Sequence, residues 1–422
     1  MKKSLIVISD YMEGQPVVAS VRYAGIMPCF AEKYVLLAIN DQRFGTGKTV
    51  YSDDNYKFHT TNSVFTQTFD GNGTAGGKKT GTLERLLRHK WVISIWRNVK
   101  LSKRLFNQKN KGLFLQLDRY LAEYEVAAVF VTVPDVYGLY VLDYIKQKHP
   151  HIPAIIEIRD IINHDIGEGN PKLSFKRAEK LVCKHGDGVI AVSQGIEKYY
   201  RGLDSALDIK LVMNGYDEQY FSECTYHSKA STEHHVTLAH IGSIYKGRNI
   251  AEFIEGLQIF SNRTGIQVTF NIVGLLDQQA LHDIQNLEPS KNGVTIQIIG
   301  SVEHHKAVEW LKSADIAVIL THVKGSDYAI PGKTFEYIGA CKPIIAVTED
   351  RELTALVHGR YGECARHDRD DIADRLTCIL QKRYDYSDRN KFSRRMQSEQ
   401  LLRFMEQKMK ETRHKKKIIN EV

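Results

Sequence analysis

The chain has 422 residues, of which 42% are hydrophobic and 26% are charged. This balance excludes a disordered chain, which lacks the apolar side chains needed to offset the entropy lost on folding, and the length predicts about two or three domains. The formal charge of +8 favours an anionic partner: nucleic acid, an acidic membrane surface or a phosphorylated substrate.

The N-terminus resembles a signal peptide, because two lysines precede the apolar run Leu5–Ile8. The run ends at Asp10, too short for a signal sequence, and no run in the chain could span a bilayer. We therefore expect a buried strand and a cytoplasmic protein. The six cysteines include no Cys-x-x-Cys pair, which argues against a disulfide framework and a structural zinc site.

Short apolar runs alternate with helical patterns along the first half of the chain. The expected strands are 5–8, 35–39, 126–133, 154–158 and 188–192, and the expected helices are 17–32, 136–148 and 172–183. Nearly continuous apolar strands between helices predict a parallel sheet covered by helices.

Residues 44–111 interrupt this alternation. Gly45–Thr49 resembles the end of a P-loop but lacks its first glycine, and Gly71–Gly76 matches GxGxxG without a preceding strand. Residues 83–106 form a basic helical stretch, and 78–111 hold eleven Lys or Arg and one acid. Trp91 and Trp96 suit a membrane interface. This stretch predicts either an ordinary helix with a solvated basic face or an anchor to anionic lipid; no nucleic-acid-binding motif accompanies the charge.

The second half repeats the alternating pattern. Its expected strands are 236–241, 268–273, 294–298, 316–320 and 343–347, and its expected helices are 249–262, 304–313, 333–340 and 392–410. The predicted domains are 1–207, which includes the basic stretch, and 208–385. Residues 386–422 are expected to form a helix that crosses back to the first domain, followed by a basic tail.

Glycines follow three strands of the second half, at Gly242, Gly274 and Gly300–Ser301. Ligands bind parallel sheets at the carboxyl ends of strands, where glycine lets them approach the backbone closely. Lys246 and Arg248 place cations there, and the helix that Gly332 and Lys333 begin attracts anions. Glu336, one turn on, can accept hydrogen bonds from a sugar diol. This set suits a nucleotide diphosphate-sugar. The histidine pairs 234/235 and 304/305 form no metal-binding motif and are interpreted as solvated or capping residues.

Four segments of residues 125–410 resemble motifs of the retaining GT-B glycosyltransferases of family 4. Ile330–Ala346 is similar to the family's PxKxxEYxxxxKPxIA segment, and Met213–Asp217 to its NG[VI]D turn; Val192–Ile196 and Glu157–Asp160 match two shorter motifs. The resemblance implies an α/β GT-B fold, in which two Rossmann-like domains face each other across a cleft.

The resemblance also implies roles for individual residues. Glu336 would bind the donor ribose, and Lys246, Arg248 and the amides of Gly332 and Lys333 would hold the diphosphate. The implied donor-binding set is completed by Gly242, Gly274, Gly300, Ser301 and Tyr328, and the implied acceptor-side set is Gly14, Arg159 and Asp160. Tyr328 replaces the first glutamate of the family's Glu-x7-Glu pair, with Asp327 beside it, and Arg159 stands where many members have histidine.

The implied activity is transfer, with retention, of a hexosyl or N-acetylhexosaminyl group from a nucleotide diphosphate-sugar to a growing, lipid-linked surface glycan. No cofactor and no metal are expected, because cations of the protein replace the metal. The expected location is cytoplasmic and peripheral on the inner face of the plasma membrane. The alternatives are a nucleotide-sugar 2-epimerase on the same fold, or a non-catalytic nucleotide-sugar-binding subunit; no carboxylate–histidine set for proton abstraction stands out in the sequence.

Overall fold

The computed structural model describes residues 3–9, 18–40, 90–111, 113–133, 136–163, 171–222, 234–245, 248–287, 293–323 and 330–421. The side chains of residues 18–20, 40, 104–111 and 415–421 are not described. The near P-loop, the GxGxxG match, Gly14, Lys246 and Tyr328 lie outside the described residues.

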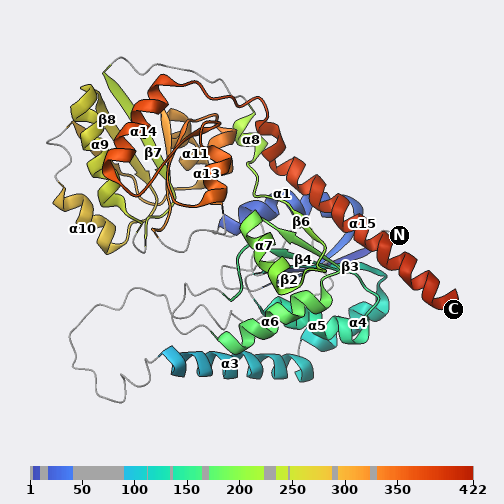
Figure 1. Cartoon of the computed structure of the whole chain (residues 1–422). Helices are drawn as coiled ribbons and strands as arrows, with labels where there is room; N and C mark the ends of the chain where they lie inside the picture. The colour runs from blue at the N-terminus through green and yellow to red at the C-terminus, as the bar shows by residue number, and fades with distance from the viewer. Residues whose placement is uncertain are drawn as a thin grey trace. The chain divides into compact units, whose positions relative to one another are not determined.

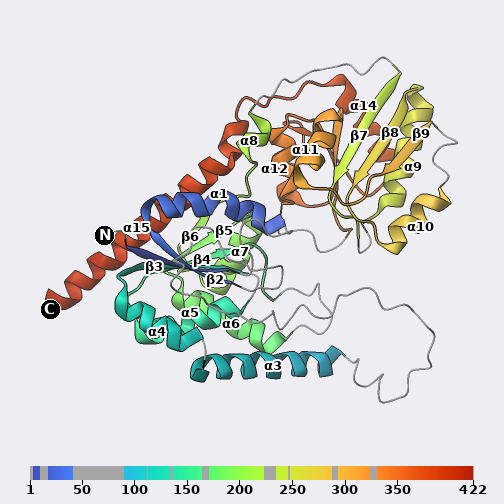
Figure 2. The same cartoon turned by 180° about the vertical axis from the view of Figure 1, so that it is seen from behind.

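The chain divides into two compact units. Unit 1 comprises residues 1–192, 196–212 and 398–422, and unit 2 comprises residues 193–195 and 213–397. The predicted boundary at 207/208 lies five residues before the main division after Val212. Each unit contains one six-stranded parallel sheet (Figures 1 and 2).

Unit 1 is built on strands in the order β2-β1-β3-β4-β5-β6. The strands are β1 Ser4–Ser9, β2 Val35–Asn40, β3 Val126–Val133, β4 Ala154–Ile158, β5 Gly188–Ala191 and β6 Ile209–Leu211. Its helices are α1 Val18–Lys33, α3 Lys90–Lys111, α4 Leu113–Glu123, α5 Tyr137–Lys148, α6 Lys172–His185, α7 Gln194–Leu203 and most of α15 Arg394–Glu421. Three predicted strands agree within one residue at either end, and β3 and β4 match fully. The edge strand β6 was not predicted, because three residues are too few to show a hydrophobic pattern.

The C-terminal helix α15 belongs to the core of unit 1. Leu401, Met405 and Met409 are buried against Tyr23 and Phe30 of α1. Lys33 also pairs with Glu406, at 2.6 Å. Apolar residues on one face of α15 therefore fasten the end of the chain to the first helix. The expected basic tail is helical, because α15 continues to Glu421.

Unit 2 has the strand order β12-β11-β10-β7-β8-β9. The strands are β7 His235–Ile241, β8 Gln267–Val273, β9 Val294–Ile298, β10 Ile316–Leu320, β11 Ile344–Val347 and β12 Gly362–Ala365. The helices are α8 Glu218–Phe221, α9 Ile250–Thr264, α10 Gln278–Asn286, α11 His304–Ser313, α12 Lys333–Gly339, α13 Arg351–Val357 and α14 Arg369–Gln381, and Arg389–Phe392 form a 3-10 turn. Two parallel α/β sheets confirm the predicted fold class, although β12 was missed.

The NGYD turn at 214–217 is held by the end of unit 2. The Tyr216 ring lies against Gly339, where an added Cβ would come within 2.6 Å of it. Arg389 donates to the Gly339 carbonyl at 2.6 Å, and Arg394 pairs with Asp217 at 2.8 Å. The NGYD turn therefore has a structural role in unit 2, where it is held by contacts with Gly339 and Arg394.

Two further observations bear on the sequence predictions. Cys29, Cys183, Cys364 and Cys378 are free thiols, and Cys341 is disulfide-bonded, a bond that the sequence analysis did not anticipate. Among the described residues no helix is long and apolar enough to cross a membrane.

Candidate functional site

The strand order of unit 2 locates its candidate site. Numbered from β7, the order is 3-2-1-4-5-6 read from the β9 edge, and it reverses between β7 and β10. Ligands of open α/β sheets bind beyond the carboxyl ends of the strands at such a reversal. Gly242 follows β7 at this point, and α12 begins shortly after β10.

The glycines after the strands shape this edge of the sheet. Gly242, Gly274 and Gly300 all have positive φ, at 110°, 154° and 79°. A Cβ at Gly274 would lie 2.4 Å from the carbonyl group of Gly242, so these two loops pack backbone against backbone. A Cβ on Gly300 would meet nothing within 4 Å. Only Gly300 leaves the open space that the sequence interpretation assigned to all three glycines.

Lys333, the first residue of α12, reaches back across the end of β7. Its Nζ lies 3.0 Å from an ideal Cβ at Gly242, and 3.1 Å from Nε2 of the fully buried His240. The other ring nitrogen, Nδ1, lies 3.0 Å from the Val318 carbonyl, which can only accept a hydrogen bond. His240 is therefore protonated on Nδ1, and Nε2 accepts from the Lys333 ammonium.

The surroundings of Lys333 and His240 disfavour a positive charge on either side chain. Burial, together with the Arg248 guanidinium, lowers the pKa of Lys333 to about 7, while the Glu336 carboxylate acts in the opposite direction. Burial, with the two neighbouring cations, holds the pKa of His240 well below its usual value. An arriving anion would relieve the repulsion between Lys333 and Arg248.

Arg248 is the third member of this group. Its Nη1 donates to the Ser243 carbonyl at 2.8 Å, and its guanidinium lies 4.7 Å from the Tyr245 ring centre. Its Nε is buried and has no hydrogen-bond partner within the described residues. Burial lowers the pKa of Arg248. We call Lys333, Arg248 and His240 the cation cluster; in the described parts of the chain neither Lys333 nor Arg248 forms an ion pair.

The start of α12 presents backbone donors beside the cation cluster. The amides of Thr334 and Phe335 are taken up by the carbonyls of Pro331 and Gly332. The amides of Gly332 and Lys333 make no hydrogen bond to any described residue. These are the two amides that the sequence assigned to the diphosphate.

Glu336 lies one turn into α12 and is held by a histidine. Its Oε1 is 3.0 Å from Nε2 of His304, the first residue of α11. The hydrogen bond to Glu336 raises the pKa of His304, and the Tyr220 ring packs edge-on to the imidazole at 5.1 Å. One carboxylate oxygen is thus fixed by His304, and the other makes no hydrogen bond to a described residue.

Tyr337 braces the two strands at the reversal point. Its hydroxyl accepts the Ile241 amide at 2.9 Å and donates to the Val318 carbonyl at 3.3 Å. Burial raises the pKa of Tyr337, so its hydroxyl stays protonated. This brace keeps α12 in register with the ends of β7 and β10.

Two of the three acceptor-side residues, Arg159 and Asp160, lie in unit 1 after the end of β4. Arg159 and Asp160 are half-buried; the guanidinium lies 5.5 Å from the Tyr23 ring centre, and Asp160 accepts the Ile161 amide at 2.9 Å. Glu157 of the same motif is fully buried and pairs with Arg22 at 2.7 Å. Glu157 is therefore a structural residue.

Two residues of the candidate site were missed by the sequence interpretation. His240 was read only as part of a strand, and His304 was interpreted as a solvated or capping residue. His304 instead holds Glu336, which makes a carboxylate–histidine pair where none was expected. The sequence contained one signal for His304: it follows a strand-end glycine by four residues, as Arg248 follows Gly242 by six.

No protein-family model and no curated protein matches the chain. Solved structures do. HepE of Anabaena, in complex with UDP, aligns with a TM-score of 0.62 at 14% identity and covers 96% of this chain and all of its own. Sucrose-phosphate synthase of Thermosynechococcus elongatus has a TM-score of 0.59 at 13% identity, covering 96% and 99%. The lipopolysaccharide outer core galactosyltransferase WaaB aligns with a TM-score of 0.59 at 15% identity and covers 94% of this chain and 97% of its own. The likeness spans both units, and the chain has the GT-B fold.

Proposed function

We propose that the protein is a retaining glycosyltransferase that moves a sugar from a nucleotide diphosphate-sugar to a growing, lipid-linked surface glycan. The observation that carries this proposal is the cation cluster: two cations at a sheet reversal point, which form no ion pair with a described residue, lie beside two backbone amides that form no hydrogen bond to one. A buried cation without a counter-ion is unfavourable, and a diphosphate supplies the counter-charge.

The chemistry follows from where charge develops. As the bond between the sugar and the diphosphate breaks, negative charge builds on the leaving diphosphate. Lys333, Arg248 and the amides of Gly332 and Lys333 would meet that charge, with Lys246 joining them as the sequence predicts. Donors fixed in advance stabilise the transition state more than the ground state. We propose on this basis that the reaction needs no metal and no cofactor.

The neighbours support the donor and acceptor classes. HepE has been solved with UDP and with UDP-glucose, so UDP-sugars are the first donors to test. WaaB is named for a lipopolysaccharide core, which accords with a surface glycan. We propose a hexosyl or N-acetylhexosaminyl group as the transferred sugar.

The His304–Glu336 pair supports a second candidate, a nucleotide-sugar 2-epimerase. Epimerisation needs a group that can accept and return a proton, and an imidazole held by a carboxylate can do so. Glu336 on α12 is better placed for a ribose, because it lies one turn beyond the amides assigned to the diphosphate. The transferase therefore remains our first proposal.

The deciding experiment follows the donor in two steps. Thermal shifts with UDP, UDP-glucose, UDP-galactose and UDP-N-acetylglucosamine identify the donor, since a ligand stabilises the state it binds. NMR of the chosen donor with enzyme and EDTA then identifies the reaction. We expect slow hydrolysis to free UDP and a sugar of retained configuration, accelerated by acceptor. A C2 epimer as product would establish the epimerase, and binding without any turnover would establish a non-catalytic subunit. Loss of turnover in EDTA would refute the metal-free mechanism.

A further inference from the structure

Helix α3 presents an apolar stripe to the outside of unit 1. At 3.6 residues per turn, Trp91, Ile95 and Val99 follow one line along the helix, and Trp96 lies beside it. Their exposed fractions are 56%, 55%, 61% and 50%. Leu173, at the start of α6, is 77% exposed. We call these five residues the α3 face.

The opposite side of α3 does the packing. Arg97 and Leu101 are buried, and Asn98 accepts the backbone amide of Ser174 on α6 at 3.1 Å. Figures 1 and 2 both show α3 as the outermost helix beside α4 and α6. The helix is therefore anchored by one side, and the side chains of its apolar stripe are half or more exposed. The interpretation of this stretch as an ordinary packed helix does not explain why two tryptophans face outward.

The two helices that carry the α3 face are rich in positive charge. Residues 90–111 contain seven Lys or Arg and no acid, and α6 adds five cations and one buried acid, Glu179. The Lys100 ammonium lies 4.7 Å from the Trp96 ring centre, and Lys103 is exposed on the next turn. Apolar side chains flanked by lysines are typical of a helix that lies in the headgroup region of an anionic bilayer.

We propose that the α3 face docks on an anionic lipid surface, with Trp91 and Trp96 inserted among the headgroups and Lys100 and Lys103 against lipid phosphates. Charge complementarity selects an anionic surface, and three of the five residues of the α3 face, Ile95, Val99 and Leu173, are aliphatic, which suits lipid better than the aromatic surfaces on which nucleic-acid bases stack. The proposal is independent of the donor chemistry, since no residue of the α3 face belongs to the cation cluster. It would also bring unit 1 to the surface where a lipid-linked acceptor lies.

The test is sedimentation of the full chain with vesicles of phosphatidylcholine alone or mixed with phosphatidylglycerol. We expect binding to the mixed vesicles only, and weaker binding in high salt. Trp91→Ala/Trp96→Ala should abolish sedimentation. Lys100→Gln/Lys103→Gln should weaken it roughly fivefold per cation removed at low salt. The control Leu203→Ser/Leu380→Ser, at exposed apolar positions elsewhere, and the control Lys198→Gln/Lys210→Gln should bind as the unmodified chain does.

Fluorescence supplies a second readout. The chain has three tryptophans, so Trp310→Phe leaves only the two on α3, and their emission should shift to the blue with mixed vesicles. Equal failure to bind both kinds of vesicle would overturn the proposal. The proposal would also be overturned if Trp91→Ala/Trp96→Ala bound the mixed vesicles as well as the unmodified chain does. Retention of the chain on single-stranded RNA at physiological salt, without binding to vesicles, would overturn it too. UDP-induced thermal shifts of each variant should match the unmodified chain, which separates failure here from failure of the proposed function.

Discussion

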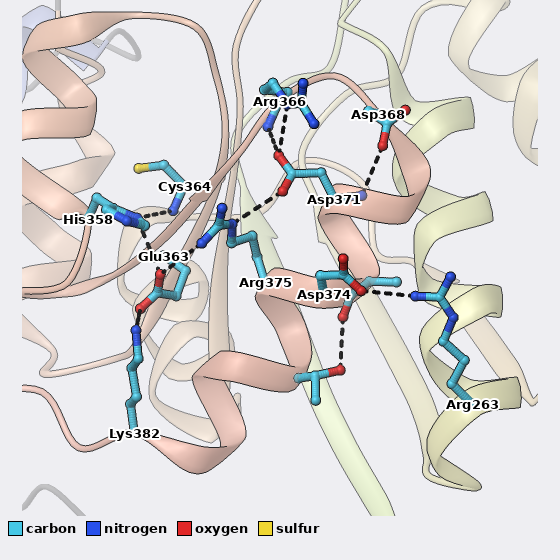
Figure 3. Close-up of polar contacts among 12 residues, drawn as sticks. Arg263, His358, Glu363, Cys364, Arg366, Asp368, Asp371, Asp374, Arg375 and Lys382 are labelled. Carbon is cyan, nitrogen blue, oxygen red and sulfur yellow. Dashed lines mark hydrogen bonds and ion pairs between the residues drawn. The ribbon is translucent and has the colours of Figure 1, made fainter.

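Unit 2 contains two polar clusters that differ in how their charges are compensated: Lys333 and Arg248 of the first are half-buried, and Glu363 of the second is fully buried. In the cation cluster, Lys333 and Arg248 lie together without an ion-pair partner among the described residues. In the second cluster, shown in Figure 3, a fully buried carboxylate, Glu363 of β12, is surrounded by cations. Lys382 and Tyr384 donate to its Oε1 at 2.8 and 3.0 Å. His358 and Arg375 approach its Oε2 at 3.2 and 3.9 Å.

The Glu363 cluster continues into a capped helix. Arg375 also pairs with Asp371 at 3.3 Å, and Asp371 accepts the Arg366 amide at 2.8 Å. Asp368 caps the start of α14 by accepting the Asp371 amide. Acids and bases alternate through this network, so its charges are compensated within the protein. In the Glu363 cluster compensated charge therefore serves the fold, whereas for Lys333 and Arg248 we propose that a ligand supplies the counter-charge.

The largest effect should come from the cation cluster. Lys333→Met removes a cation that faces the leaving diphosphate, so kcat should fall roughly 100- to 1000-fold. Its thermal stability should not fall, because the variant removes an uncompensated charge. Lys342→Met is the matched control: its Nζ donates to the carbonyls of Lys312 and Ala314, at 2.6 Å each. That variant should lose about 2 kcal/mol of stability and keep its activity. A Lys333→Met variant that loses stability but keeps its activity, with a Lys342→Met variant that does the opposite, would contradict the contrast between the two clusters.

Glu336 should give the next largest effect. A charged hydrogen bond to a ribose contributes about 1.5–3 kcal/mol, so Glu336→Ala should reduce kcat/KM roughly 10- to 100-fold. His304→Gln should also reduce kcat/KM, but by a smaller factor, because it only weakens the contact that holds the Glu336 carboxylate in place. Both are measured by steady-state kinetics, with circular dichroism as the control for folding. Near-normal kinetics for Glu336→Ala would remove Glu336 from the donor site.

Glu363→Gln tests the structural side of the comparison. The variant weakens the charged hydrogen bonds from Lys382 and Tyr384, which should lower the free energy of unfolding by about 2 kcal/mol. Its UDP affinity and kcat should stay unchanged, because the Glu363 cluster lies between β12 and α14. Urea denaturation measures the free energy of unfolding, and calorimetry measures the UDP affinity. A catalytic defect at full stability would show that this cluster also serves the reaction.

The smallest effect concerns pH. The pKa of Lys333 is lowered to about 7, so free protein loses this charge as pH rises through 7, and a bound diphosphate raises the pKa again. UDP binding should therefore take up a proton near pH 8, and its affinity should weaken with rising pH by at most tenfold per unit. The same lowered pKa makes the unliganded fold more stable as pH rises from 7 towards the ordinary lysine value. Calorimetry in two buffers measures the uptake, which should vanish in Lys333→Arg; persistent uptake there would assign the proton to another group.

Most strands could be predicted from the sequence because parallel strands buried on both faces appear as continuous apolar runs. Ile316–Leu320 and Ala154–Ile158, each fully buried, match their predicted ranges for this reason. Strands β6 and β12 escaped because they are short edge strands. In β12 a buried glutamate also breaks the apolar run, and its burial depends on Lys382 and Tyr384, which follow 19 and 21 residues later.

The sequence by itself determined most of the strands and the alternation of strands with helices, and the candidate residues that stand at fixed distances from strand ends: Gly242, Arg248, Lys333 and Glu336. These are local features, because helix starts and strand-end glycines depend on neighbouring residues. Only the tertiary structure decided their partners. His240 meets Lys333 across 93 residues and His304 meets Glu336 across 32, and sheet order alone brings them together. The outward turn of Trp91 and Trp96 was decided in the same way, because a helical period identifies a stripe but not which stripe faces the core.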